Sequence, residues 1–364
     1  MAERRLIVVG PLPPPVHGVA VSTGLVLANP LLNERFVVEH LDTSDHRPGA
    51  SIGRWDARNV RLGLQSLRDL RRRLNGRPGV LYLPLSQSAG GVLRDSFLIR
   101  AAARRRWRVA VHLRGGEFDS AYAGFPTPLR AWVRGTLARL TSAAVMGDSL
   151  RGVFGGLVPP ERIEVVPNGT PDPLGVVPDH SVPGPVLFLS SLRERKGVAE
   201  AVQAAVLVLG EVPEARFVFA GEWRSEGLRR ALEARAEEAG DAIRFLPPVD
   251  EVGRRRLLEE ASLLLFPPTL PEGHPRVVIE ALAAGLPVVT TDRGTIAETV
   301  VDGECGFVLA APNPAELAAR IVALLRDDPL RLTMSAAARR RYEERYTQET
   351  ADRRLADWLE AVAG

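Results

Sequence analysis

Cysteine and lysine are almost absent from this chain of 364 residues. Cys305 is the only cysteine, so the chain alone builds no disulfide, cysteine-rich zinc site or iron–sulfur cluster. This composition suits a reducing compartment, and with too short an apolar run at the start for a secretory signal we expect a cytoplasmic protein. Lys196 is the only lysine among 47 basic residues. Because arginine is the default cation here, the single lysine is a candidate functional residue.

Long apolar runs and several catalytic motifs are also missing. No stretch approaches the roughly 20 uninterrupted apolar residues of a membrane-spanning helix. The sequence has no GxGxxG after a strand, no GxxxxGK[ST], no HExxH and no GxSxG. These absences argue against a dinucleotide dehydrogenase, a P-loop protein, a zinc hydrolase of that type and a lipase-like enzyme. A DxD pair that would hold a divalent cation on a diphosphate is absent too, so we expect no metal ligands and no required cofactor.

The charge is divided unevenly along the chain. Residues 1–168 hold 24 arginines and 13 carboxylates, a net +11, whereas residues 169–364 hold 23 basic and 31 acidic residues, a net −8. A basic first half indicates an anionic partner on that side. The alternative is an arginine-rich solvated surface without a partner.

Short aliphatic runs alternate with helical patterns in both halves, which is typical of parallel sheets covered on both faces. The predicted strands are Arg5–Gly10, Phe36–Leu41, Val80–Leu85, Arg108–Leu113, Ala143–Gly147, Ile163–Pro167, Pro185–Ser190, Arg216–Gly221, Ile243–Pro247, Leu263–Pro267 and Pro287–Thr291. We therefore expect an α/β protein with two doubly wound domains, 1–168 and 185–346. The Pro- and Gly-rich residues 169–184 between them are predicted to be a linker.

The segment EGHPRVVIE, from Glu272 to Glu280, is the strongest chemical signal. It follows the predicted strand Leu263–Pro267, and Pro275 is expected near the first turn of a helix. Free backbone N–H groups at that turn would bind an anion, and the two glutamates suit sugar or ribose hydroxyls. Alternatively, Glu272 caps the helix and Glu280 is a surface carboxylate.

Residues Glu272–Leu325 resemble the retaining nucleotide-sugar glycosyltransferases of glycosyltransferase family 4, whose signature is two glutamates separated by seven residues. The resemblance implies the GT-B fold, with two Rossmann-like domains facing a cleft and a C-terminal helix (about 347–364) returning to the first domain. It implies that Glu280 binds the ribose hydroxyls and Glu272 the hydroxyls of the donor sugar. The backbone of Gly273, His274 and Pro275 would lie along the sugar and the phosphates.

Other segments match the same family in the same order. By this resemblance, the segment GPLPPPVHGVAVS contains a diphosphate loop at His17 and Gly18. In the segment RVAVHLRGGEF, the resemblance implies that His112 reaches the donor sugar. In the segment SSLRERKG, it implies that Lys196 neutralises the diphosphate. His112 could instead be a satisfied core histidine. The chain departs from the family at Ser190 and Ser191, where an arginine is usual, and at Gly294–Thr295, where the family has a glycine pair. Residues that could replace the missing diphosphate charge are Arg193, Arg195 and Arg276.

The resemblance implies metal-independent, retaining transfer of a sugar such as a hexose from a nucleoside-diphosphate sugar, a UDP- or GDP-sugar, to a hydroxyl acceptor. Arg54–Leu74 is predicted to be a basic amphipathic helix, and Trp107 lies among the arginines of 104–108. Such stretches suit an anionic membrane surface, which favours a peripheral enzyme acting on a lipid-linked or phosphorylated glycan precursor. The alternative is a packed helix with its charged face in water.

Two other functions fit the same sequence. The altered diphosphate loop would also suit a catalytically inactive GT-B subunit that binds a sugar nucleotide, and a GT-B sugar-nucleotide epimerase would need no acceptor. We expect no nucleic-acid partner, since the sequence contains no recognisable binding module.

Overall fold

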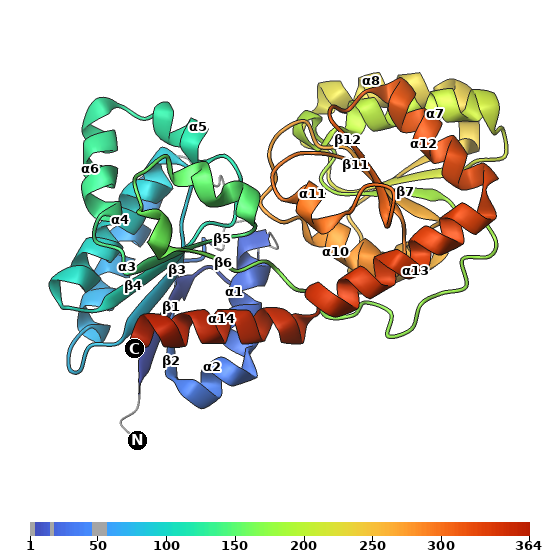
Figure 1. Cartoon of the computed structure of the whole chain (residues 1–364). Helices are drawn as coiled ribbons and strands as arrows, with labels where there is room; N and C mark the ends of the chain where they lie inside the picture. Colours follow the sequence, from blue (N-terminus) through green and yellow to red (C-terminus); the bar gives the residue numbers. More distant parts are fainter. Residues whose placement is uncertain (1–3, 15–17, 46–56) are drawn as a thin grey trace. The chain divides into compact units, whose positions relative to one another are not determined.

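The computed structural model describes residues 4–14, 18–45 and 57–364 (Figure 1). Internal contacts divide the chain into two compact units. Unit 1 comprises residues 1–167 and 349–364, and unit 2 comprises residues 168–348.

Unit 1 is built on a six-stranded parallel sheet in the order β2-β1-β3-β4-β5-β6. The strands are β1 (Arg5–Gly10), β2 (Val37–Asp42), β3 (Val80–Pro84), β4 (Arg108–His112), β5 (Ser142–Val145) and β6 (Ile163–Val165). The helices are α1 (Gly18–Ala28), α2 (Pro30–Arg35), α3 (Ala57–Arg73), α4 (Ala89–Arg104), α5 (Phe118–Ala123), α6 (Thr127–Leu137) and the C-terminal α14 (Gln348–Ala363), with 3₁₀ turns at Asp148–Phe154 and Pro160–Arg162.

The strands β1, β3 and β5 of unit 1 are mostly apolar because both faces of the sheet are covered there, whereas the edge strand β2 carries Glu39 and His40 and is only partly buried. Ile7 and Val9 of β1 pack in one core with residues of α3 and α4. Leu6 and Val8 point to the opposite face, where Trp358 of α14 joins their cluster. The C-terminal helix therefore completes the core of unit 1, although it is the last element of the chain (Figure 1).

Unit 2 has a second six-stranded parallel sheet in the order β12-β11-β10-β7-β8-β9. Its strands are β7 (Val186–Leu189), β8 (Phe217–Ala220), β9 (Ile243–Leu246), β10 (Leu263–Phe266), β11 (Val288–Thr291) and β12 (Gly306–Leu309). Its helices are α7 (Val198–Glu211), α8 (Glu226–Ala236), α9 (Glu251–Glu260), α10 (Arg276–Ala283), α11 (Ile296–Thr299), α12 (Pro314–Arg326) and α13 (Asp328–Arg345), with 3₁₀ turns at Glu194–Lys196 and Glu237–Ala242.

The segment 169–184, predicted to be a linker, lies within unit 2 and is tied to it by side chains. Arg331 of α13 is fully buried, and its Nη2 donates to the carbonyl of His180 at 3.3 Å. Tyr342 donates its hydroxyl to the carbonyl of Thr170 at 3.0 Å, and burial raises the pKa of this phenol to about 12. The segment has the composition of a loop, but its contacts hold it against α10 and α13.

The eleven predicted strands all occur, each within two residues of the predicted bounds, so the two-sheet α/β fold is confirmed. The strand β12, which has only four residues and pairs with β11 at the sheet edge, was not predicted. No helix among the described residues combines the length and the apolarity that a membrane crossing requires.

Candidate functional site

Two loops of unit 2, each following a strand of the sheet, bring predicted site residues together. One loop follows β10 and contains Glu272. The other follows β7 and ends in the 3₁₀ turn Glu194–Lys196. Gly197 then takes a left-handed conformation with φ of 73°, and a Cβ there would overlap the carbonyl oxygen of Pro267. Only glycine allows this loop to lie so close to the end of β10. The main-chain N–H of Thr269 also donates to the carbonyl of Arg195 at 3.2 Å.

Lys196 and Glu272 meet between these loops. Nζ of Lys196 donates to Oε1 of Glu272 at 2.6 Å, and each side chain is 14% exposed. The ammonium also lies 5.4 Å from the ring centroid of Phe266. The single lysine and the first glutamate of the signature, 76 positions apart, thus form one partly buried ion pair.

Glu272 is positioned by the loop after β11. Glu272 forms an isolated parallel bridge with Gly294, and the hydroxyl of Thr295 donates to the carbonyl of Gly273. Gly294 has a φ of 71°, and a Cβ there would overlap the Glu272 backbone. The Gly294–Thr295 departure from the family pattern keeps the glycine where the close approach requires it, and the threonine supplies a hydrogen bond.

The second glutamate, Glu280, lies inside α10 and is buried. Its Oε1 accepts a hydrogen bond from Nη1 of Arg254, on α9, at 3.1 Å. Pro275 is the residue that precedes the first turn of α10, so the N–H groups of that turn stand at the same loop as Glu272. A cation, two carboxylates and a helix N-terminus suit a ligand that carries both anionic groups and hydroxyls.

The His274 side chain packs away from this cluster. Its Nδ1 accepts a hydrogen bond from the main-chain N–H of Asn168 at 3.0 Å, and the Asn168 amide donates to the His274 carbonyl at 2.8 Å. The imidazole also lies edge-on to Tyr346, with ring centroids 5.1 Å apart. Arg276 donates to the carbonyl of Gly169 at 2.8 Å. The His274 and Arg276 side chains thus fasten the signature loop to residues 168–169, whereas Arg193 and Arg195 lie in the loop that follows β7.

Two predicted residues belong to unit 1. Gly18 is the first residue of α1, after the loop that follows β1, while His17 lies outside the described residues. His112, at the end of β4, is buried with both ring nitrogens bonded: Nδ1 to the hydroxyl of Tyr82 at 3.1 Å and Nε2 to the carbonyl of Val166 at 2.9 Å. This arrangement fits the alternative in which His112 is a core histidine with its hydrogen bonds satisfied. Burial, with the charge of Arg114 as a lesser cause, lowers the pKa of His112 well below its ordinary value.

Several contacts of the predicted site residues could not be predicted from the sequence. Arg254, Asn168 and Thr295 each bond a residue of the signature segment, and Trp358 lies edge-on to His112 with ring centroids 5.8 Å apart. Asn168 had a signal in its VVPNG segment, but Arg254 is one of three consecutive arginines on a helix and carried none. No group of three or more His, Cys, Asp or Glu side chains placed to hold a metal ion occurs within the ranges that the structure covers.

The match to a protein-family model lies in the second half of the chain. Residues 183–341 match the family model described as glycosyl transferases group 1. A phosphatidyl-myo-inositol mannosyltransferase of Mycobacterium leprae is 35% identical over 162 residues, which are 43% of this chain and 42% of the relative. A glycogen synthase of Mycobacterium tuberculosis is 30% identical over 229 residues, 62% of this chain and 52% of the relative. The chain thus matches about half the length of these curated relatives.

Solved structures resemble the chain over its whole length. The Anabaena protein HepE, in complex with UDP and glucose, superposes with a TM-score of 0.76 at 17% identity over 99% of this chain and 100% of its own. A glycosyltransferase from Rickettsia africae superposes with a TM-score of 0.77 at 13% identity over 100% of this chain and 99% of its own. At such identities the likeness shows the fold alone. Residues 183–341 therefore match the glycosyl transferases group 1 family model, and the chain has the two-sheet α/β fold of GT-B glycosyltransferases.

Proposed function

We propose that this chain is a retaining glycosyltransferase of the family 4 type that transfers a sugar from a nucleoside-diphosphate sugar to a hydroxyl acceptor. The observation that carries the proposal is the Lys196–Glu272 pair beside the N-terminus of α10. The group 1 family match and the UDP bound in the HepE structure support a sugar-nucleotide donor. UDP- and GDP-sugars are both candidates.

In the proposed reaction, the bond between the sugar and the diphosphate breaks, and negative charge grows on the leaving nucleotide. Lys196, an arginine of the Arg193–Arg195 loop and the α10 N-terminus stabilise this charge without a metal ion. The acceptor hydroxyl attacks the sugar on the face that the diphosphate leaves, and a diphosphate oxygen takes its proton. Glu272 binds hydroxyls of the sugar and Glu280 those of the ribose. We assign His112 no proton transfer, because both of its ring nitrogens are bonded in the core of unit 1.

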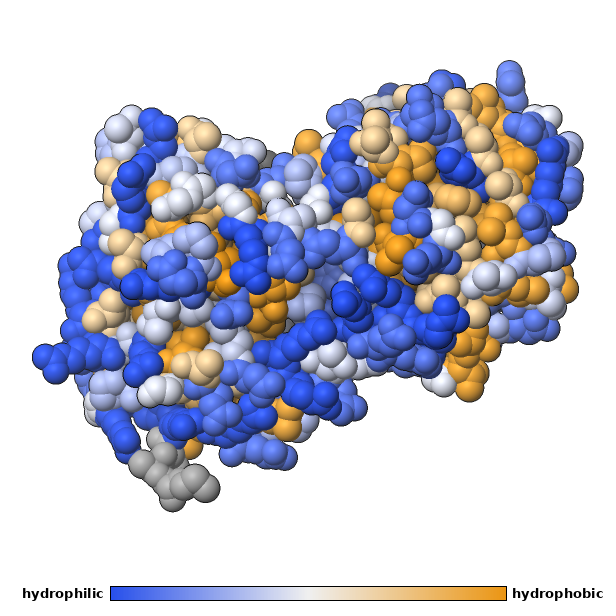
Figure 2. Space-filling view, in the orientation of Figure 1, coloured by the Kyte–Doolittle hydropathy of each residue, from blue (hydrophilic) through white to orange (hydrophobic). Residues whose placement is uncertain are grey.

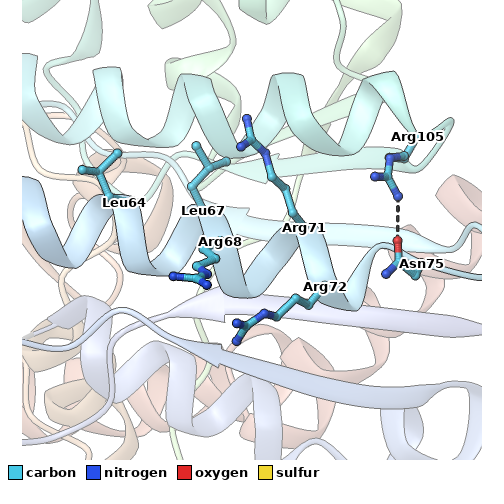
Figure 3. Close-up of a pocket in the computed structure, with 7 residues that line it drawn as sticks. All are labelled: Leu64, Leu67, Arg68, Arg71, Arg72, Asn75 and Arg105. Atoms are coloured by element: carbon cyan, nitrogen blue, oxygen red, sulfur yellow. Dashed lines mark hydrogen bonds between the residues drawn. The ribbon is translucent and has the colours of Figure 1, made fainter.

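The acceptor proposal depends on α3 of unit 1. Arg68, Arg71 and Arg72 of α3 line a pocket of about 320 Å³ together with Arg105 (Figure 3). Leu64, 63% exposed, lines the same pocket. Arginines beside an exposed aliphatic side chain suit an anionic lipid surface or a phosphorylated glycan. The similarity to the phosphatidyl-myo-inositol mannosyltransferase of Mycobacterium leprae supports a glycolipid-related acceptor at a cytoplasmic membrane face.

The test is a panel of UDP-, GDP- and ADP-sugars without added metal. We expect one nucleotide series to raise the melting temperature of the native chain and to be hydrolysed or transferred. Lys196→Ala should lower kcat by about 10²- to 10³-fold, the usual effect of removing one donor to a developing anion. Glu280→Ala should weaken nucleotide binding. Arg326→Ala is a matched control, since Arg326 pairs with Glu211 on an exposed part of unit 2.

Three other outcomes would contradict the proposed transferase function. A shift with no hydrolysis or transfer would favour an inactive sugar-nucleotide-binding subunit. Conversion of one sugar nucleotide to another without an acceptor would indicate an epimerase. If no nucleotide shifts the melting temperature of the native chain, the donor site is wrong.

A further inference from the structure

The Glu280 carboxylate has one oxygen bonded and one available. Arg254 Nη1 donates to Oε1 at 3.1 Å, and the Glu280 side chain is 10% exposed. No second hydrogen bond to this carboxylate occurs within 4–14, 18–45 and 57–364. A carboxylate that is held through one oxygen presents the other at a defined angle, which is what recognition of a ligand hydroxyl requires.

Arg254 is presented by a well-anchored helix. It lies in the first turn of α9, where Asp250 accepts the N–H of Gly253 at 2.8 Å and closes the N-terminus. Leu258 of α9 is fully buried in the core of unit 2, and the neighbouring Arg255 donates to the carbonyl of Leu174 at 3.2 Å. The helix is therefore fixed on two sides, so the base of the Arg254 side chain has a set position relative to α10.

We propose that Arg254 is a positioning residue of the donor site, which holds the Glu280 carboxylate so that its second oxygen accepts a ribose hydroxyl of the nucleotide. The inference rests on the proposed function, in which Glu280 binds the ribose. A guanidinium has only donors, so it orients the carboxylate without competing for the hydroxyl protons of the ligand.

The experiment measures binding of UDP and GDP by calorimetry to the native chain, Arg254→Ala, Arg254→Lys and Glu280→Ala, and to the Arg254→Ala/Glu280→Ala double variant. For the nucleotide that binds the native chain, we expect Arg254→Ala to weaken binding about tenfold, the scale of one charge-assisted hydrogen bond. Lysine should restore part of the loss. In the Glu280→Ala background, Arg254→Ala should cost nothing further. With the 2′,3′-dideoxy form of the nucleotide, native chain and Arg254→Ala should bind alike.

Arg256→Ala is the matched control. Arg256 lies on the same helix and pairs with Glu260 at 2.6 Å, but its side chain is 77% exposed and its ion-pair partner is not a signature residue. Its loss should leave nucleotide binding and donor KM unchanged, whereas Arg254→Ala should raise donor KM more than it lowers kcat.

The outcomes separate this inference from the proposed function. If Glu280→Ala weakens nucleotide binding but Arg254→Ala does not, the positioning role of Arg254 is wrong and the donor site stands. A loss that persists with the dideoxy nucleotide, or in the Glu280→Ala background, also overturns the role, because Arg254 would then act independently of the ribose contact. Native-like binding by Glu280→Ala would overturn both proposals.

Discussion

At the scale of single residues, burial decides what His112 can do. The imidazole is surrounded by Tyr82, Val166 and Trp358, and its low pKa keeps it neutral in the folded chain. In the unfolded chain a histidine takes up a proton near pH 6.5. Below that pH the unfolded state therefore binds a proton that the native state does not.

From this difference we predict an acid-sensitive stability. As pH falls below about 6.5, His112 should reduce the free energy of unfolding by up to about 1.4 kcal/mol per pH unit, until the folded pKa is reached. Urea unfolding of the native chain and of His112→Gln, which does not titrate, at pH 7.5, 6.0 and 5.0 measures this contribution. The difference in stability between the two proteins should shrink toward pH 5.0. Parallel pH dependences would show that the imidazole is protonated inside the folded unit.

At the scale of elements, the candidate site depends on loops that approach one another closely at the ends of strands. Gly294 is the clearest case, since the loop after β11 touches the backbone of Glu272 at a position that only glycine can occupy. The ion pair between Glu272 and Lys196 depends in turn on this loop, because Glu272 is held between the two.

We predict that Gly294→Ala damages the site more than the fold. A methyl group at Gly294 must push the Glu272 backbone aside, and the variant should lose at least about tenfold in nucleotide affinity, comparable to losing one charged contact. Gly210→Ala is the control. Gly210 lies near the end of α7 with nothing within 4 Å of an added Cβ, so alanine should bind nucleotide normally. Calorimetry with UDP and GDP measures both variants, and equal affinities would contradict the proposed role of the loop.

At the scale of the whole molecule, the basic first half of the sequence forms most of unit 1, and the acidic second half forms most of unit 2. The face of unit 1 visible in Figure 2 is largely hydrophilic, with apolar residues scattered through it. Arg5 and Arg73 share the carboxylate of Glu39, whereas Arg68 and Arg71 make no ion pair with any residue in the described ranges. Uncompensated arginines on α3 are the feature that an anionic surface would neutralise.

We predict salt-sensitive binding to vesicles with anionic headgroups and none to neutral phosphatidylcholine vesicles. Arg68→Gln combined with Arg71→Gln should weaken binding by about 1 kcal/mol for each charge removed, and binding should fall as salt shortens the Debye length. The control removes Arg230 and Arg235, two exposed arginines of unit 2, in the same way. Sedimentation at 50 and 300 mM salt measures the effect. If the two double variants bind alike, α3 is a solvated helix and the acceptor proposal loses its support.

The local patterns of the sequence determined the two sheets and most of the candidate site. Apolar runs bounded by Gly and Pro predict strands because each pattern lies within a few residues, and the order of strands and helices then predicts two parallel sheets. Glu272, Glu280 and Lys196 stand out for the same reason, being unusual residues in short segments after strands.

What only the tertiary structure decided are contacts between residues far apart in the chain. Arg254 reaches Glu280 across 26 positions, and the segment 169–184 is held by Arg331 from more than a hundred positions away. His112 had two alternatives in the sequence, and its partners Tyr82, Val166 and Trp358 come from three other elements or loops. Composition and spacing do not predict which distant side chains come into contact, because these contacts depend on how sheets and helices pack in three dimensions. The sequence therefore predicts where the chemistry lies, and packing decides which groups are held in place for it.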